Sequence, residues 1–191
     1  MRLEILERGH RLGTKALLVV IRLVSRQPVV DAVKLAFYRP DFYGAGALTN
    51  EAMRGQSTWS VGDRELMAAL VSKVNECPFC VAAHTATSSL WYGDNPKVVA
   101  TLADLDSAPI DEPLRATLRM LVKLTRENTL DAEDVRAVLD GGVSPEQIRD
   151  ALAVSLAFNI TSRLANAFGF AMASPAAMQA GAQHLLKRGY G

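Results

Sequence analysis

The sequence predicts a single-domain, all-α protein, and three observations favour that fold class. At three places a helix-capping residue precedes a proline, which fits the first turn of a helix because its missing N–H needs no partner there. These pairs are Asn95-Pro96, Ser144-Pro145 and Ser174-Pro175. Apolar residues also recur at intervals of three and four, as on one face of a helix. The alternating pattern typical of strands is hard to find, so we expect a helical bundle.

Taken in order, the expected helices cover 3–12, 14–25, 29–38, 61–74, 78–92, 96–105, 112–127, 132–139, 145–170 and 175–188. Periodicity supports the longer ones. In the helix over 112–127, Leu114 and Leu118 belong to an apolar face opposite basic residues. Ser144 and Gln147 match a capping box, in which each residue binds the backbone of the other at a helix start.

The segment 40–59 is the weakest part of this helical pattern. Its turn-favouring residues are Pro40, Gly44, Gly46, Asn50 and Gly55. Because such residues interrupt helices, we expect the segment to be rich in loops. We expect residues 1–39 to form basic amphipathic helices and residues 40–191 to form the helical core.

Composition and charge exclude some functional classes. Of the 191 residues 49% are hydrophobic and 21% are charged, which is ordinary for a globular protein. The net charge of +1 argues against nucleic acid as a partner, since a nucleic-acid binder usually carries a clear basic excess. Residues 1–39 nevertheless hold eight basic and three acidic residues. This basic, apolar segment is expected to dock on the core, on a partner subunit or on an anionic membrane.

We expect a cytoplasmic location. The short apolar run from Ala16 to Val24 is interrupted by Arg22, and no cleavage site typical of a signal peptide follows it. No stretch reaches the ~18 consecutive apolar residues of a membrane span. In a reducing compartment, two cysteines in a CxxC spacing indicate redox or metal chemistry more than a structural disulfide.

Both cysteines of the chain lie in one short motif, Cys77-Pro78-Phe79-Cys80. Pro78 cannot lie deep inside a helix, so the preceding helix ends near residue 75 and a new one begins at Pro78. Cys77 is then the N-cap and Cys80 the third helical residue, close to free backbone N–H groups and the positive end of the helix dipole. Such positions favour a thiolate, and a CxxC pair at this spacing can close a disulfide.

His84 and Glu65 are the candidate partners of the thiols. At about 100° per residue, His84 falls on the same side of the helix as Cys77 and Cys80, and its side chain leans back toward Cys80. It can act as a base or as a cation that stabilises the thiolate. Glu65 lies on the preceding helix, from which its carboxylate can reach the sulfurs or the imidazole.

Two other interpretations of the motif stay open. A buried structural cysteine pair is one of them. The other is a zinc site, in which Cys77, Cys80 and His84 would be joined by Glu65 or Glu76. Structural zinc usually uses a second pair of soft ligands, and the chain has no other cysteine. We therefore expect no bound metal.

The spacing of these residues resembles a known family. Glu65, Cys77, Cys80 and His84 fit the E-x11-C-x2-C-x3-H signature of the AhpD-like alkylhydroperoxidases, within the carboxymuconolactone decarboxylase superfamily. The stretch 157–169 resembles the helix of that family that contains Asn and Arg. The similarity covers about residues 40–175 and is most specific at the cysteine motif.

The resemblance implies an all-helical trimer or hexamer that reduces hydroperoxides. Cys80 would attack the peroxide and Cys77 would resolve the product as a disulfide, while His84 and Glu65 would relay the proton. An external dithiol, either a protein or a small molecule, would reduce the disulfide, so no bound cofactor is expected. Phe79 stands where the best-known peroxidase of the family has a histidine, and it cannot donate a proton. A redox sensor, or a protein that exchanges disulfides with a partner, is therefore the second hypothesis.

Overall fold

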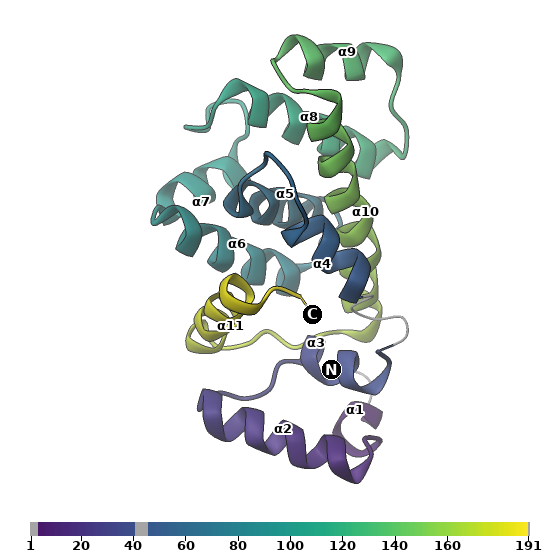
Figure 1. Cartoon of the computed structure of the whole chain (residues 1–191), viewed down its shortest axis with the longest axis vertical. Helices are drawn as coiled ribbons and strands as arrows, with labels where there is room; N and C mark the ends of the chain where they lie inside the picture. The colour runs from purple at the N-terminus through teal and green to yellow at the C-terminus, as the bar shows by residue number, and fades with distance from the viewer. Residues whose placement is uncertain (1–3, 41–45, 191) are drawn as a thin grey trace.

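The computed structural model describes residues 4–40 and 46–190, and within these ranges it contains eleven α-helices and no strand (Figure 1). The helices are α1 (Ile5–Arg8), α2 (Leu12–Ser25), α3 (Asp31–Tyr38), α4 (Gly46–Arg54), α5 (Val61–Val74), α6 (Pro78–Tyr92), α7 (Asn95–Ala103), α8 (Glu112–Glu127), α9 (Ala132–Asp140), α10 (Pro145–Phe168) and α11 (Pro175–Arg188). The predicted all-α, single-domain fold is confirmed.

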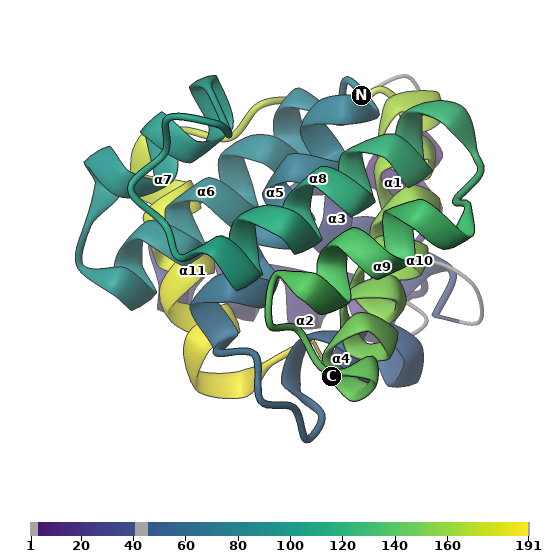
Figure 2. The same cartoon turned by 90° about the horizontal axis from the view of Figure 1, so that it is seen from above.

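Helix α5 is the centre of the bundle. It packs against α6, α8 and α10, and ten of its fourteen residues are buried. Figure 2 shows α8 lying across α5 when the molecule is viewed from above. Leu66, Met67 and Val71 of α5 are almost fully enclosed in the main apolar core. A side chain on α5 can therefore be held inside the protein from several directions.

Most of the predicted helix starts are confirmed. The Ser144 hydroxyl accepts from the Gln147 N–H, the Gln147 side chain returns the bond, and α10 begins at the following proline. At the start of α11 the Ser174 hydroxyl accepts from the Ala177 N–H at 3.2 Å, without a returned bond. One start is shifted by a residue, because the Asp94 side chain accepts from the Lys97 N–H at 2.9 Å and so begins α7 at Asn95.

The segment 40–59 was expected to be rich in loops, but its middle part forms α4. Residues 41–45, including Gly44, lie outside the described residues. The turn-favouring residues of α4 are outweighed by tertiary packing, because Ala52 and Met53 are buried in the main core. Local propensity is a weak predictor when a helix gains burial of this kind.

The N-terminal helices differ from the prediction in their bounds. Helix α2 begins at Leu12 instead of residue 14, and α3 begins at Asp31 instead of residue 29. A helix was expected over 3–12, but α1 ends at Arg8 and the chain turns before α2. His10 in this turn is buried against the Tyr38 ring, with 5.7 Å between ring centroids. A glycine before His10 favours this turn over a continuous helix. The division at residues 39 and 40 stays a prediction.

Helix α2 lies at the end of the molecule opposite α8 and α9 (Figure 1). None of its residues is buried, and its exposed apolar side chains include Leu12, Leu23 and Val24. Among the helices that the structure describes, none is long and apolar enough to cross a membrane.

Candidate redox-active site

The turn between α5 and α6 places Cys77 at the start of helix α6. Asn75 ends α5, and Glu76 adopts a left-handed conformation with φ of 53°. The Cys77 N–H then donates to the Ser72 carbonyl at 2.9 Å. Cys77 is the N-cap residue and Pro78 the first residue of α6, which confirms the predicted register.

Three polar side chains of α10 hold this turn. The Asn75 amide donates to the Asn159 side-chain oxygen at 3.0 Å, and the Asn166 amide donates to the Asn75 carbonyl at 2.8 Å. Arg163 lies 3.5 Å from the Asn75 side-chain oxygen. All three belong to the stretch 157–169 that carries the family resemblance. Within this fold the stretch fixes the backbone two residues before the first cysteine.

Cys77 and Cys80 lie within 3.2 Å of each other and do not form a disulfide. Both lie inside the fold, with 1% and 2% of their surfaces exposed. A hydrogen bond from Cys80 lowers the pKa of Cys77 to about 7, although burial opposes it, and the backbone N–H groups of Cys80 and Phe79 add to the effect. The pair therefore releases its first proton near neutral pH.

The second proton stays on Cys80. Its hydrogen bond to Cys77, its burial and the Cys77 charge all raise the pKa of Cys80. The hydroxyls of Ser72 and Ser162 oppose this rise from the other side. These two hydroxyls are themselves 2.9 Å apart and fully buried, so Cys80 has a polar contact in an otherwise apolar region.

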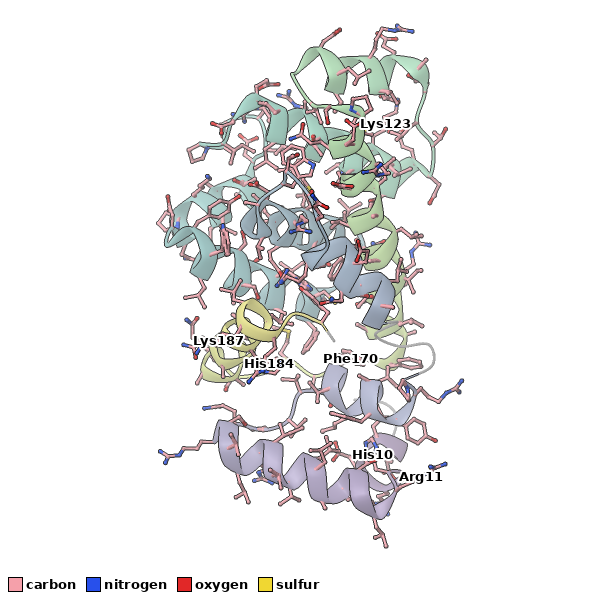
Figure 3. All side chains as sticks on the ribbon, viewed as in Figure 1. His10, Arg11, Lys123, Phe170, His184 and Lys187 are labelled. Carbon is pink, nitrogen blue, oxygen red and sulfur yellow. The ribbon has the colours of Figure 1, made fainter. Side chains whose placement is uncertain are left out.

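Four partly buried apolar side chains pack against the buried cluster that contains both cysteines, Phe79 and Ala165, and we refer to these four side chains as the cover. Its members are Val30, Ala32, Phe170 and Met178. Phe170, labelled in Figure 3, lies in the connection between α10 and α11. Its ring meets the Phe79 ring edge-on, with 5.3 Å between centroids. Phe79 thus serves as packing surface for the cover.

Glu65 of α5 is completely buried and is bound by two basic side chains. His84 Nδ1 lies 2.7 Å from Oε2, and Arg54 Nη2 lies 2.6 Å from Oε1. Burial alone would raise the pKa of Glu65, but the hydrogen bond and charge of His84, together with Arg54, outweigh it and hold the pKa below its ordinary value. Of the two targets proposed for Glu65, the structure shows the imidazole.

Tyr190 and Arg54 are site residues that the sequence did not reveal. The Tyr190 hydroxyl lies 2.9 Å and 3.1 Å from the two Glu65 oxygens and 3.3 Å from His84 Nδ1. Tyr190 is 125 residues from Glu65 in sequence, and Arg54 lies in the segment expected to be loops. No local pattern marks either residue.

His84 faces Glu65 with its Nδ1 nitrogen. Because an ionised carboxylate only accepts hydrogen bonds, we assign a proton to Nδ1. The hydrogen bonds of the ring go to Glu65 and Tyr190 within the described ranges, and Nε2 has no partner there. The sequence indicated an imidazole leaning over Cys80, but the structure shows no hydrogen bond between the ring and either sulfur. Nε2 is therefore the ring nitrogen left to exchange a proton.

The part of the chain that the structure describes contains no group of three or more His, Cys, Asp or Glu side chains suited to a metal ion. An open hollow of about 950 Å³ between α5, α7, α8 and α10 is lined by Asn75, Glu76 and Arg163, among others. None of the four predicted site residues lines it. The two sulfurs therefore lie away from this hollow, in the interior of the fold.

The fold and this site define an all-α protein with a buried cysteine pair beside a glutamate–histidine pair. No family model matches the chain, and no curated protein matches its sequence. A solved peroxidase-related protein from Silicibacter sp. TM1040 is 25% identical, with a TM-score of 0.76 over 91% of this chain and 92% of that chain. A second structure, from Ralstonia eutropha JMP134, is described as an alkylhydroperoxidase AhpD core and peroxidase-related protein. It is 20% identical, with a TM-score of 0.76 over 90% of this chain and 91% of that chain. The chain therefore has an AhpD-like fold.

Proposed function

We propose that this protein is a thiol-dependent hydroperoxide reductase whose redox centre is Cys77 and Cys80. The observation that carries the proposal is a reduced cysteine pair, 3.2 Å apart at the start of α6, in which one thiol ionises near neutral pH. A thiolate is the form that attacks peroxides. The likeness to a solved peroxidase-related protein supports the same chemistry.

The proposed reaction has three balanced steps. The Cys80 thiolate attacks one peroxide oxygen, the O–O bond breaks, and the leaving oxygen takes a proton to give an alcohol and a sulfenic acid on Cys80. The Cys77 thiol then displaces the sulfenic oxygen as water and forms a disulfide. An external dithiol exchanges with this disulfide, so that the pair is reduced and the dithiol is oxidised.

Cys80 is the proposed attacking sulfur even though the first negative charge is on Cys77. The two thiols are close enough for the remaining proton to pass from Cys80 to Cys77 within the pair. A negative charge on Cys80 raises the pKa of the Tyr190 hydroxyl. Because this hydroxyl binds Glu65 and lies close to His84, Cys80 is linked electrostatically to the Glu65–His84 pair. His84 Nε2 is the proposed carrier of the proton that the leaving oxygen takes.

The burial of the sulfurs favours a small peroxide over a partner protein as the oxidant. Disulfide exchange with a protein requires an accessible sulfur, whereas both sulfurs are almost fully enclosed. The dithiol that completes the cycle must reach the pair after the cover has moved. Because the electrons come from this dithiol, the reaction requires no bound metal or organic cofactor. The reducing cytoplasm is the proposed location.

The experiment that tests this function is peroxide consumption in the presence of a dithiol. We expect Cys80→Ser and Cys77→Ser each to reduce turnover by more than about a hundredfold, because the disulfide can no longer form. Trapping of sulfenic acid after one equivalent of peroxide assigns the roles, with Cys77→Ser expected to form it and Cys80→Ser not. Turnover by both variants at the wild-type rate would refute the reductase. Sulfenic acid in Cys80→Ser alone would reverse the roles.

A further inference from the structure

Tyr190 contacts every member of the group that surrounds Glu65. Besides its hydroxyl contacts with Glu65 and His84, its ring stacks on the His84 ring at an interplanar angle of 18°, with 6.2 Å between centroids. The Arg54 guanidinium lies over the same ring, 5.1 Å from its centroid. Tyr190 therefore fixes the positions of a carboxylate, an imidazole and a guanidinium relative to one another.

The backbone before Tyr190 is built to bring its side chain to this place. Gly189 has φ of 73°, and a Cβ there would lie 2.5 Å from the Asn50 side-chain oxygen, so no other residue fits without strain. That oxygen accepts the Tyr190 N–H at 3.0 Å. Arg54 also donates to the Leu185 carbonyl at 3.1 Å, which ties α11 to α4. Helix α4 and the end of α11 together enclose the Glu65 carboxylate.

Glu65 is linked to Cys80 through Tyr190, because the hydroxyl that binds the Glu65 carboxylate also experiences the charge of Cys80. The negative charge of Glu65 disfavours a thiolate on Cys80, as like charges do. The groups that hydrogen-bond Glu65 are Arg54 from α4, His84 from α6 and Tyr190 after α11. The charge of Arg64, on α5 itself, also interacts with Glu65. The three hydrogen-bonding groups each donate to the carboxylate, and such donors spread and neutralise its charge.

We propose that Tyr190 is a positioning residue whose hydroxyl holds the Glu65 carboxylate toward His84 and shields its charge from Cys80. This role rests on the proposed reductase function. It acts through Glu65 and requires no direct contact between Tyr190 and the peroxide. The pKa of the Tyr190 hydroxyl is raised by burial and by the Glu65 charge, so it stays a hydrogen-bond donor at working pH.

The test is Tyr190→Phe, which keeps the ring and removes only the hydroxyl. Without this donor the Glu65 charge is less shielded, so we expect the thiol ionisation curve, followed by the ultraviolet absorbance of the thiolate, to move to higher pH. That measurement needs no turnover and no access of a reagent to the buried sulfurs. We also expect kcat for peroxide reduction to fall about tenfold with little change in KM, because the imidazole is less well placed.

Two further variants separate positioning from a merely structural role. Tyr92→Phe is the matched control, since it removes another tyrosine hydroxyl hydrogen-bonded to a carboxylate, that of Asp63, away from the cysteines. It should leave the ionisation curve and kcat unchanged. In a Glu65→Gln background there is no charge to shield, so Tyr190→Phe should cause no further shift of the curve.

The outcomes distinguish this role from the reductase itself. An ionisation curve that is the same in Tyr190→Phe and the wild type overturns the positioning role, even if peroxide is reduced normally. An equal shift in Tyr92→Phe, or a full shift in the Glu65→Gln background, overturns it as well. A shifted curve in a protein that consumes no peroxide supports the shielding by Tyr190 and refutes the reductase.

Discussion

Glu65 is the residue at which the contacts of the site converge. It is completely buried, and three donors from separate parts of the chain bind its two oxygens. A buried charge with no such partners would cost several kcal/mol, and removing a partner from a buried pair typically costs about 3–5 kcal/mol. The arrangement around Glu65 thus stabilises the fold in addition to its role in the proposed chemistry.

This burial predicts a specific dependence of stability on pH. The pKa of Glu65 is lowered from its ordinary value of 4.5, so its folded state favours the ionised form. The contribution of ionised Glu65 to the free energy of unfolding is fully present above pH 4.5. It is lost as the pH falls through the lower pKa that Glu65 has in the folded state. We expect Glu65→Gln to lower the free energy of unfolding at neutral pH by about 3 kcal/mol. It should also weaken the acid dependence.

Urea unfolding followed by circular dichroism, from neutral pH to below the ordinary glutamate pKa, measures both effects. Glu127→Gln is the control, because Glu127 is exposed at the end of α8. It should unfold like the wild type at every pH. If Glu65→Gln retains the full acid dependence of the wild type, Glu65 is not the carboxylate responsible.

At this scale the sequence could predict only what a local pattern contains. The spacing in sequence was sufficient to identify Glu65, Cys77, Cys80 and His84. Helical geometry left two targets for the Glu65 carboxylate, the sulfurs and the imidazole. Tyr190 reaches the site from another part of the chain, and such a contact depends on how α11 packs on α6. The sequence left burial of the cysteine pair open and could not decide it, because the cover comes from residues distant in sequence.

For individual helices, predictions based on capping chemistry were accurate. Ser144, Ser174 and Pro78 mark helix starts by hydrogen bonds and backbone restrictions that act over a few residues, and the structure shows each start. Helix α4 shows the opposite case. Its sequence contains Gly46 and Asn50, and its helix is stabilised by burial against distant parts of the core.

The role of burial in α4 can be tested with Met53→Ala. Met53 is 0% exposed, and Met172, between α10 and α11, is 56% exposed. Truncation of a fully buried methionine leaves a cavity and typically costs about 2–5 kcal/mol. We expect Met53→Ala to lower the free energy of unfolding by this amount in a urea titration, and Met172→Ala to lower it by less than about 0.5 kcal/mol. Equal effects would mean that packing of Met53 does not stabilise the fold.

At the scale of the whole molecule, charge and apolar surface are unevenly distributed. Residues 1–39 hold eight basic and three acidic residues, whereas residues 40–191 hold 13 basic and 17 acidic residues. Helix α2 adds an exposed apolar surface to the basic part. A basic, apolar surface of this kind is complementary in charge to residues 40–191 of a second copy of the chain, which carry an acidic excess. We propose that α2 contributes to the trimer or hexamer that the family resemblance implies.

This assembly predicts the effect of Leu23→Glu in α2. Leu23 is 69% exposed, so an added charge should not disturb the fold of one chain, but it should oppose burial against another. We expect light scattering after gel filtration to give a trimer or hexamer for the wild type and a smaller species for Leu23→Glu. Val99→Glu, at an exposed valine of α7, is the control and should keep the wild-type mass. A monomeric wild type, or an unchanged mass for Leu23→Glu, would contradict this role for α2.

The cover over the cysteines also has a consequence for the order in which the protein matures. Val30 comes from the beginning of the chain, whereas Phe170 and Met178 come from near its end. Synthesis on the ribosome proceeds from the N-terminus, so both sulfurs emerge long before the last parts of their enclosure exist. The nascent chain therefore passes through a period in which the pair is open to oxidants, and it becomes protected only when α11 has folded into place.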